Sequence, residues 1–187
     1  MKPKHRADAP DTGRRVFLKA SVMAGVAAAL SSSVGAESLA SIVRADGPHD
    51  PHQAEALLLT CMDYRLHDET ERYMTGRGLR NKYDQIVLAG ASLGAVTETR
   101  PDWNKTFWDH LALAIELHKI QRVMVLDHRD CGAYKLILGE DFSKDPKKET
   151  EAHAVQLKRL EGLIKERRAE LEVELLLMSL SGKVERV

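Results

Sequence analysis

Two short motifs in the 187-residue chain carry side chains that can bind a metal and accept protons. The first, CMDYR, places Cys61, Asp63 and Arg65 at alternating positions after an apolar run. The second, HRDCG, places His128 and Cys131 three residues apart after another apolar run. Two thiolates and one imidazole form a Zn²⁺ ligand set of the catalytic type, which leaves a fourth position for water or a carboxylate.

The apolar runs before the motifs predict two buried strands, at residues 56–60 and 122–128. Alternate side chains of an extended chain leave on one face, so Cys61, Asp63 and Arg65 are expected to point the same way. Ligands of open α/β sheets bind beyond the carboxyl ends of the strands. Both motifs therefore meet at one crevice if these two strands are neighbours and the intervening strand lies on the other side of the first.

The elements around the motifs alternate between strands and helices, which predicts an α/β domain with a mainly parallel central sheet of about four strands flanked by helices. The expected strands cover residues 56–60, 84–90, 122–128 and 171–180. The first expected helix begins at residue 67 and ends near Gly76 to Gly78, and the others cover residues 104–120, 131–139 and 152–168. Residues 90–96 and the charged stretch 140–150 are expected to be loops, and residues 181–187 an edge hairpin or a tail.

The order C-x-D-x-R followed by H-x-x-C, each after a strand, resembles the β-class carbonic anhydrases, in a divergent and shortened form. The resemblance implies that Cys61, His128 and Cys131 bind Zn²⁺ and that Asp63 and Arg65 form the catalytic dyad. It also implies a fold like that of the family and reversible hydration of CO₂ to bicarbonate and a proton by zinc-bound hydroxide. The resemblance further implies a closed, inactive state in which Asp63 binds the metal as a fourth ligand. It also implies that the chain forms a homodimer or a higher homo-oligomer.

The chain departs from the family after the second strand, where many members carry Arg-Asn-Ala-Gly and this chain has Val87 and Leu88 before Ala89-Gly90. The same scaffold also suits a COS or CS₂ hydrolase, because both substrates are linear and undergo the same attack. A zinc-holding or bicarbonate-binding module without turnover is a second alternative, and a Cys–His hydrolase using Cys131 is a third.

The cysteines have an alternative interpretation, and the remaining histidines need one of their own. Two cysteines in an exported protein also fit a Cys61–Cys131 disulfide. His67 is expected to be an exposed histidine at the start of a helix, with a proton-shuttle role as the alternative. His110, His118 and His153 are expected to be solvated or capping residues on helices.

The N-terminus has the three parts of an export signal: the basic pair Arg14-Arg15, the apolar run 20–30 and small residues ending at Ala36. The arginine pair with Phe-Leu-Lys resembles a twin-arginine signal, which implies passage through the twin-arginine translocase and a periplasmic or otherwise exported location. We predict a signal peptide and linker at residues 1–45, cleaved near 36–45, and a catalytic domain at residues 46–187.

The charge balance excludes some partners. Residues 1–36 carry six basic and two acidic side chains, so their removal leaves a formal charge of about −4. A weakly acidic domain has no electrostatic footprint for nucleic acid or anionic lipid. The apolar run near the N-terminus is too short for a stable span, so no membrane span is expected after cleavage.

Overall fold

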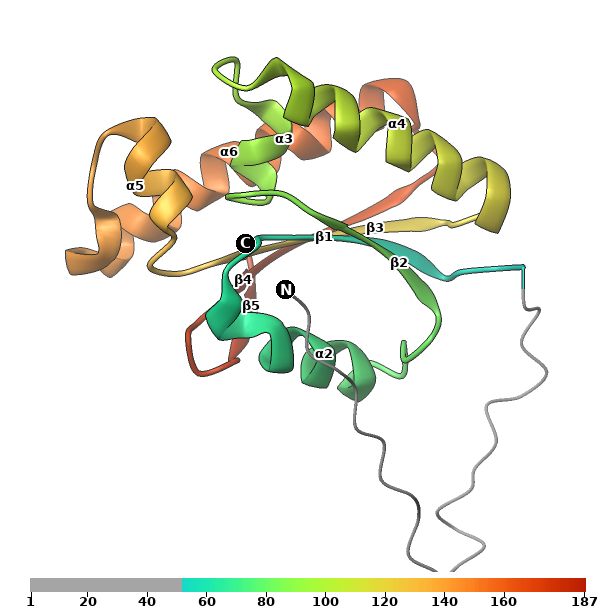
Figure 1. Ribbon diagram of the computed structural model, residues 1–187, viewed down its shortest axis with the longest axis horizontal. Coiled ribbons are helices and arrows are strands. Elements are labelled where there is room, and N and C mark those ends of the chain that lie inside the picture. The colour runs from blue at the N-terminus through green and yellow to red at the C-terminus, as the bar shows by residue number, and fades with distance from the viewer. Residues whose placement is uncertain (1–51) are drawn as a thin grey trace, which may run out of the picture. The chain divides into compact units, whose positions relative to one another are not determined.

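The computed structural model describes residues 52–187, so the predicted signal peptide and linker, residues 1–45, lie outside this part of the chain. A five-stranded sheet with the order β2-β1-β3-β4-β5 forms its centre (Figure 1). The strands are β1 (Ala56–Thr60), β2 (Tyr83–Val87), β3 (Arg122–His128), β4 (Glu172–Met178) and β5 (Val184–Arg186). The first four run parallel and β5 pairs antiparallel with β4, which confirms the predicted fold class and the edge hairpin.

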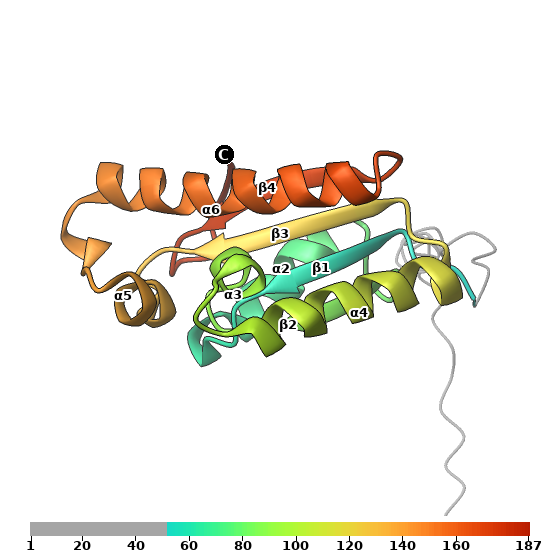
Figure 2. The ribbon, with the colours of Figure 1, turned by 90° about the horizontal axis from the view of Figure 1, so that it is seen from above.

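The helices are α2 (His67–Gly76), α3 (Ser92–Val96), α4 (Pro101–His118), α5 (Gly132–Leu138) and α6 (Pro146–Arg167). Two short 3₁₀ turns, η1 (Tyr64–Leu66) and η2 (Phe142–Lys144), lie in the connections. Helices α3, α4 and α6 cover one face of the sheet and α2 covers the other, while α5 lies beyond the carboxyl edge (Figures 1 and 2).

The core follows the alternation of side chains along the strands. Leu57 and Leu59 of β1 pack with α4 and α6, whereas Leu58 lies on the opposite face with Met74 of α2. All five residues of β1 are buried, as expected for a central parallel strand covered on both faces.

Several expected boundaries were wrong. Helix α4 begins at Pro101, three residues earlier than expected, and three further differences lie in the connections. Strand β2 ends at Val87, three residues earlier than predicted, because the chain turns at Gly90 with a φ of 77°. The expected loop 90–96 contains helix α3. The expected loop 140–150 ends early because α6 begins at Pro146, where the side chain of Asp145 accepts hydrogen bonds from the amides of Lys147 and Lys148.

Candidate metal centre

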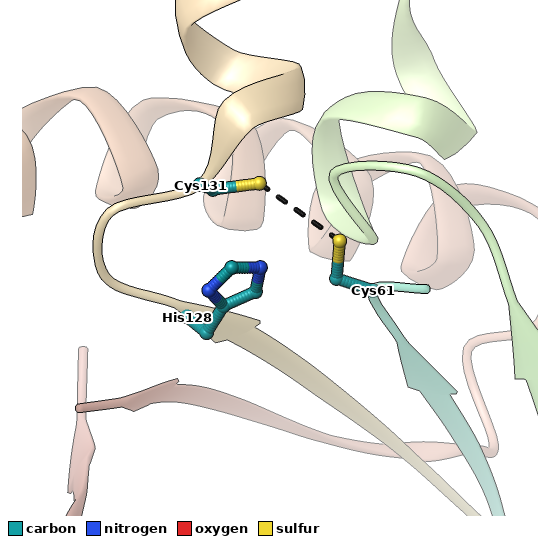
Figure 3. A group of neighbouring side chains, drawn as sticks. All are labelled: Cys61, His128 and Cys131. Atoms are coloured by element: carbon teal, nitrogen blue, oxygen red, sulfur yellow. Dashed lines mark hydrogen bonds between the residues drawn. The ribbon is translucent and has the colours of Figure 1, made fainter. Parts of the chain in front are cut away.

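The three predicted ligands converge at the carboxyl edge of the sheet (Figure 3). Cys61 directly follows β1, His128 is the last residue of β3, and Cys131 precedes α5. Because β1 and β3 are adjacent and parallel, their carboxyl ends lie side by side. The ligand atoms of the three residues all lie within 4.8 Å of one another. The predicted strand order, with β3 on one side of β1 and β2 on the other, is therefore confirmed.

The sulfur atoms of Cys61 and Cys131 are 3.9 Å apart, and both cysteines are free. Two sulfurs bound to one tetrahedral zinc at 2.3 Å lie about 3.8 Å apart, whereas bonded sulfurs of a disulfide lie about 2.05 Å apart. The observed spacing therefore fits shared metal ligation, and the disulfide alternative does not describe this structure.

The imidazole of His128 is presented as a ligand. Its Nδ1 lies 2.8 Å from the carbonyl oxygen of Arg129, so this nitrogen carries the proton and donates it. Its Nε2 is buried and has no hydrogen-bond partner among the described residues. Metal-binding histidines commonly donate one ring N–H to a carbonyl and use the other nitrogen for the metal. The residues present therefore fit a zinc ion.

The local electrostatics favour a thiolate at Cys61. The hydrogen bond from Cys131 lowers the pKa of Cys61 most; burial opposes it, and contacts with His128 and the Gly90 amide also lower it, to about 4. The Gly90 N–H donates to Cys61 Sγ at 3.3 Å. The pKa of Cys131 is raised, because its thiol donates to Cys61 and is itself buried. The backbone amides of Ala133 and Tyr134, in the first turn of α5, act in the opposite direction and favour the Cys131 thiolate. The Cys131 side chain makes no capping hydrogen bond to this helix.

Asp63 and Arg65 form a bidentate ion pair beside the ligands. Arg65 Nε donates to Asp63 Oδ1 at 2.9 Å, and Arg65 Nη2 donates to Oδ2 at 2.8 Å. These hydrogen bonds lower the pKa of Asp63 to about 2, so it is a carboxylate at neutral pH. Asp63 Oδ2 also lies 3.8 Å from His128 Nε2, at the same corner of the site.

The expected alternation does not explain how Asp63 and Arg65 come together. Strand β1 ends at Thr60, and residues 64–66 form the 3₁₀ turn η1. Asp63 caps this turn by accepting the amide of Arg65 at 3.0 Å. The carboxylate and guanidinium therefore meet across a tight turn rather than along an extended strand. Arg65 is also held by Asp130, whose carboxylate accepts from Nη1 at 2.8 Å and whose carbonyl accepts from Nη2 at 3.0 Å.

His67 is exposed at the start of α2, as expected. It lines a pocket of about 220 Å³ that Cys61 also lines, so the pocket reaches the metal centre. A second recess, about 10 Å³ in volume, adjoins Cys61 and His128, and its apolar walls include Leu66 and Met178. This second recess therefore has room for about one water molecule.

A buried polar cluster behind the ligands was missed by the sequence reasoning. Asp127, 1% exposed, accepts hydrogen bonds from Ser92, Tyr134 and His153. The expectation that His153 is solvated or capping was wrong, because it is buried and pairs with Asp127. The available signal was a lone carboxylate inside the otherwise apolar run VMVLDH.

The chain is therefore an α/β protein with a mainly parallel sheet, and a Cys–His–Cys set that could hold a metal ion lies at the carboxyl edge of the sheet. The model of a family described as "Putative carbonic anhydrase" matches residues 52–187, and the chain belongs to that family. Within the same residues, no helix combines the length and apolar character needed to cross a bilayer.

Two relatives and one solved structure are similar to this chain. An uncharacterized protein of Rickettsia conorii is 40% identical over 136 residues, which is 73% of each chain. An uncharacterized protein of Rickettsia bellii is also 40% identical over 136 residues, covering 73% of this chain and 83% of the relative. A crystal structure of carbonic anhydrase from Streptococcus mutans is 20% identical, with a TM-score of 0.50, over 74% of this chain and 86% of that one. This last likeness supports the fold.

Proposed function

We propose that this protein catalyses the zinc-dependent, reversible hydration of CO₂ to bicarbonate and a proton. The observation that carries the proposal is the convergence of two sulfurs and an unpartnered imidazole nitrogen within 4.8 Å, at the corner that Asp63 also reaches. Membership of the family supports the same activity.

Cys61, His128 and Cys131 would hold the zinc. When bound, zinc would lower the pKa of a coordinated water to about 7 and so supply a nucleophile at neutral pH. Asp63 would accept a hydrogen bond from that nucleophile and orient it toward the substrate. Arg65 holds both oxygens of Asp63, which keeps the carboxylate from turning inward to become a fourth ligand.

Apolar side chains beside Cys61 and His128 support a small substrate of low polarity. Leu66, Leu126 and Met178 line the recess there, which has room for about one water molecule. CO₂ is linear and has no net dipole, so apolar walls accept it without leaving a buried polar group unpaired.

The test uses the full chain, purified after folding in the presence of zinc. We expect about one zinc per chain by elemental analysis, and CO₂ hydration by stopped-flow spectroscopy that is lost in Cys131→Ser. Assays with COS and CS₂ run in parallel distinguish the hydrolase alternatives. Bound zinc with no turnover of any of the three substrates would instead support a binding module.

We also propose that the protein is exported by the twin-arginine translocase to the periplasm. Support comes from the sequence alone, from Arg14-Arg15, the apolar run and the small residues that end at Ala36. Replacing both arginines with lysine is expected to abolish export of a reporter fusion while leaving its synthesis unchanged. Export of the double variant at the wild-type level would contradict this route.

We further propose that two copies of the chain associate. Strand β2 is an edge of the sheet, and the apolar side chains Val87, Leu113 and Leu117 are about half exposed near it. A groove of about 190 Å³ between β2 and α4 includes Leu113 and Leu117. Sedimentation of Leu117→Glu should reveal a monomer where the wild type is a dimer, and a monomeric wild type would refute the pairing.

A further inference from the structure

We propose that Asp127 is a positioning residue that holds the three ligand-bearing segments in metal-binding geometry. The inference rests on the proposed metal site. Asp127 precedes His128 in β3, so its backbone is continuous with one ligand. Its side chain contacts Ser92, in the turn beside Cys61, and Tyr134, in the helix that follows Cys131.

The first contact fixes the turn at residues 90–92, whose Gly90 amide contacts Cys61. Asp127 Oδ1 accepts the backbone N–H of Ser92 at 2.9 Å, and Oδ2 accepts the Ser92 hydroxyl at 2.6 Å. Ser92 follows Ala91, whose φ of 40° and ψ of −100° lie outside the regions that alanine normally adopts. Such a conformation is strained and persists only where its surroundings hold it. The same turn carries the Gly90 N–H that donates to Cys61 Sγ.

The second contact fixes the helix that follows Cys131. The hydroxyl of Tyr134, in the first turn of α5, donates to Asp127 Oδ2 at 2.6 Å and lies 2.9 Å from the Ser92 hydroxyl. The two turns also pack directly, because a Cβ built at Gly90 would lie 3.2 Å from the Cβ of Ala133. A shift of either turn would therefore move both cysteine ligands.

The third contact connects the site to α6. His153 Nδ1 lies 2.8 Å from Asp127 Oδ2, and its ring packs on Tyr134 with centroids 3.9 Å apart. Asp127 and His153 are each 1% exposed, and Ser92 is fully buried. A carboxylate is an acceptor through both oxygens, so it satisfies all of these donors at once. Asparagine has the same shape but replaces one oxygen with a donor, so it cannot satisfy them all.

The proposal predicts that Asp127→Asn weakens zinc binding by about 10- to 100-fold, the range typical of residues that orient metal ligands. Zinc affinity is measured by competition with a chromophoric chelator. At saturating Co²⁺, the thiolate-to-cobalt charge-transfer and d–d bands of the variant should also shift, because the ligands bind with altered geometry. A residue that only stabilises the fold would leave the spectrum of the saturated protein unchanged.

Glu174→Gln is the matched control, because Glu174 is another largely buried carboxylate, with 11% side-chain exposure, and pairs with Arg77. It lies opposite Met124 in the sheet, four residues before His128. This substitution should lower stability while zinc affinity stays within about twofold of wild type. If Asp127→Asn does not fold, Ser92→Ala and Tyr134→Phe carry the test, each removing one donor and keeping the packing. For these we expect weakening of at least threefold, with a shifted cobalt spectrum.

Wild-type zinc affinity and an unchanged cobalt spectrum in Asp127→Asn, or in both milder variants where it does not fold, would overturn the positioning role and leave the proposed activity standing. Zinc binding that depends on Asp127 in a protein without CO₂ hydration would support the positioning role and refute the activity. A wild-type chain that binds no zinc would overturn both proposals.

Discussion

Asp63 faces His128 across the metal centre, with Oδ2 of the carboxylate 3.8 Å from Nε2 of the imidazole. Both oxygens of Asp63 are already occupied by the guanidinium of Arg65. The carboxylate is thus close enough to the ligands to become one, and its pairing with Arg65 keeps it available as a hydrogen-bond acceptor. Arg65 and a bound zinc ion would therefore compete for one carboxylate.

Arg65→Ala is expected to retain about one zinc per chain and to lose CO₂ hydration by about 100-fold or more, because Asp63 is free to turn toward the metal. Arg65→Lys keeps the charge without the planar fork, so we expect it to remain within about tenfold of Arg65→Ala. Stopped-flow hydration at matched zinc content measures both. Wild-type rates in Arg65→Lys would show that charge alone holds Asp63.

The double variant Asp63→Ala/Arg65→Ala is the control for this explanation. If Arg65 acts through Asp63, the two substitutions affect one unit, and the combined loss is smaller than the product of the single losses. Independent, multiplying effects in the double variant would mean that Arg65 acts directly on the substrate.

Gly94 in α3 is predicted to reject any side chain. A Cβ at this position would lie 2.6 Å from the carbonyl oxygen of Ala89 and 3.2 Å from the Cβ of Leu88. Gly94→Ala should therefore lower the free energy of unfolding by about 1–3 kcal/mol in urea denaturation, through overpacking. Gly162→Ala in α6 meets no atom within 4 Å and should stabilise by about 0.5–1 kcal/mol. Equal effects of the two substitutions would contradict this assignment.

Glu174 is predicted to stabilise the fold above acidic pH. Burial by itself raises the pKa of Glu174, but contacts with Arg77, and then with Arg122 and Arg186, lower it below its ordinary value. A carboxyl with a depressed folded-state pKa stabilises above its unfolded pKa of about 4.3, and the contribution is lost as pH falls through the folded value. Glu174→Gln should cost about 1–2 kcal/mol at pH 7 and almost nothing near pH 3 in urea unfolding.

The neighbouring Glu172 provides the control for the pH effect. Its side chain is 71% exposed and contacts Arg122, so Glu172→Gln should change the unfolding free energy by less than about 0.5 kcal/mol at either pH. A Glu174→Gln penalty that persists undiminished at pH 3 would show that packing, and not charge, is the source of the stabilisation.

Removal of the metal is predicted to expose the two cysteines to oxidation. Their sulfurs are 3.9 Å apart, and the pKa of Cys61 is lowered to about 4, so a nucleophilic thiolate faces a second thiol. Chelated protein treated with oxidised glutathione should form an internal disulfide and lose the ability to take up zinc. Zinc-loaded protein should keep both thiols, as measured by thiol titration and mass spectrometry. Equal oxidation rates with and without zinc would argue against shared ligation by Cys61 and Cys131.

The main elements were predictable because strands and helices have strong periodic patterns. The run 122–128 is bounded as expected, and the sulfurs and imidazole that follow strands β1 and β3 meet because parallel neighbours end at one edge. Element ends were harder to predict, because they depend on single side chains. Asp145 starts α6 within a charged stretch, and Gly90 ends β2 early within an apolar one.

The amino-acid sequence by itself determined the fold class and the three candidate ligands, since motif spacing and strand periodicity are local properties of the chain. It also singled out Asp63 and Arg65, but the turn that joins them was not expected. Only the tertiary structure showed what supports those ligands. Asp127 reads locally as one acid in an apolar strand, and His153 as one histidine on a polar helix. Their roles arise because segments far apart in the chain pack together and exclude water, so each buried polar group must find its partner in another segment.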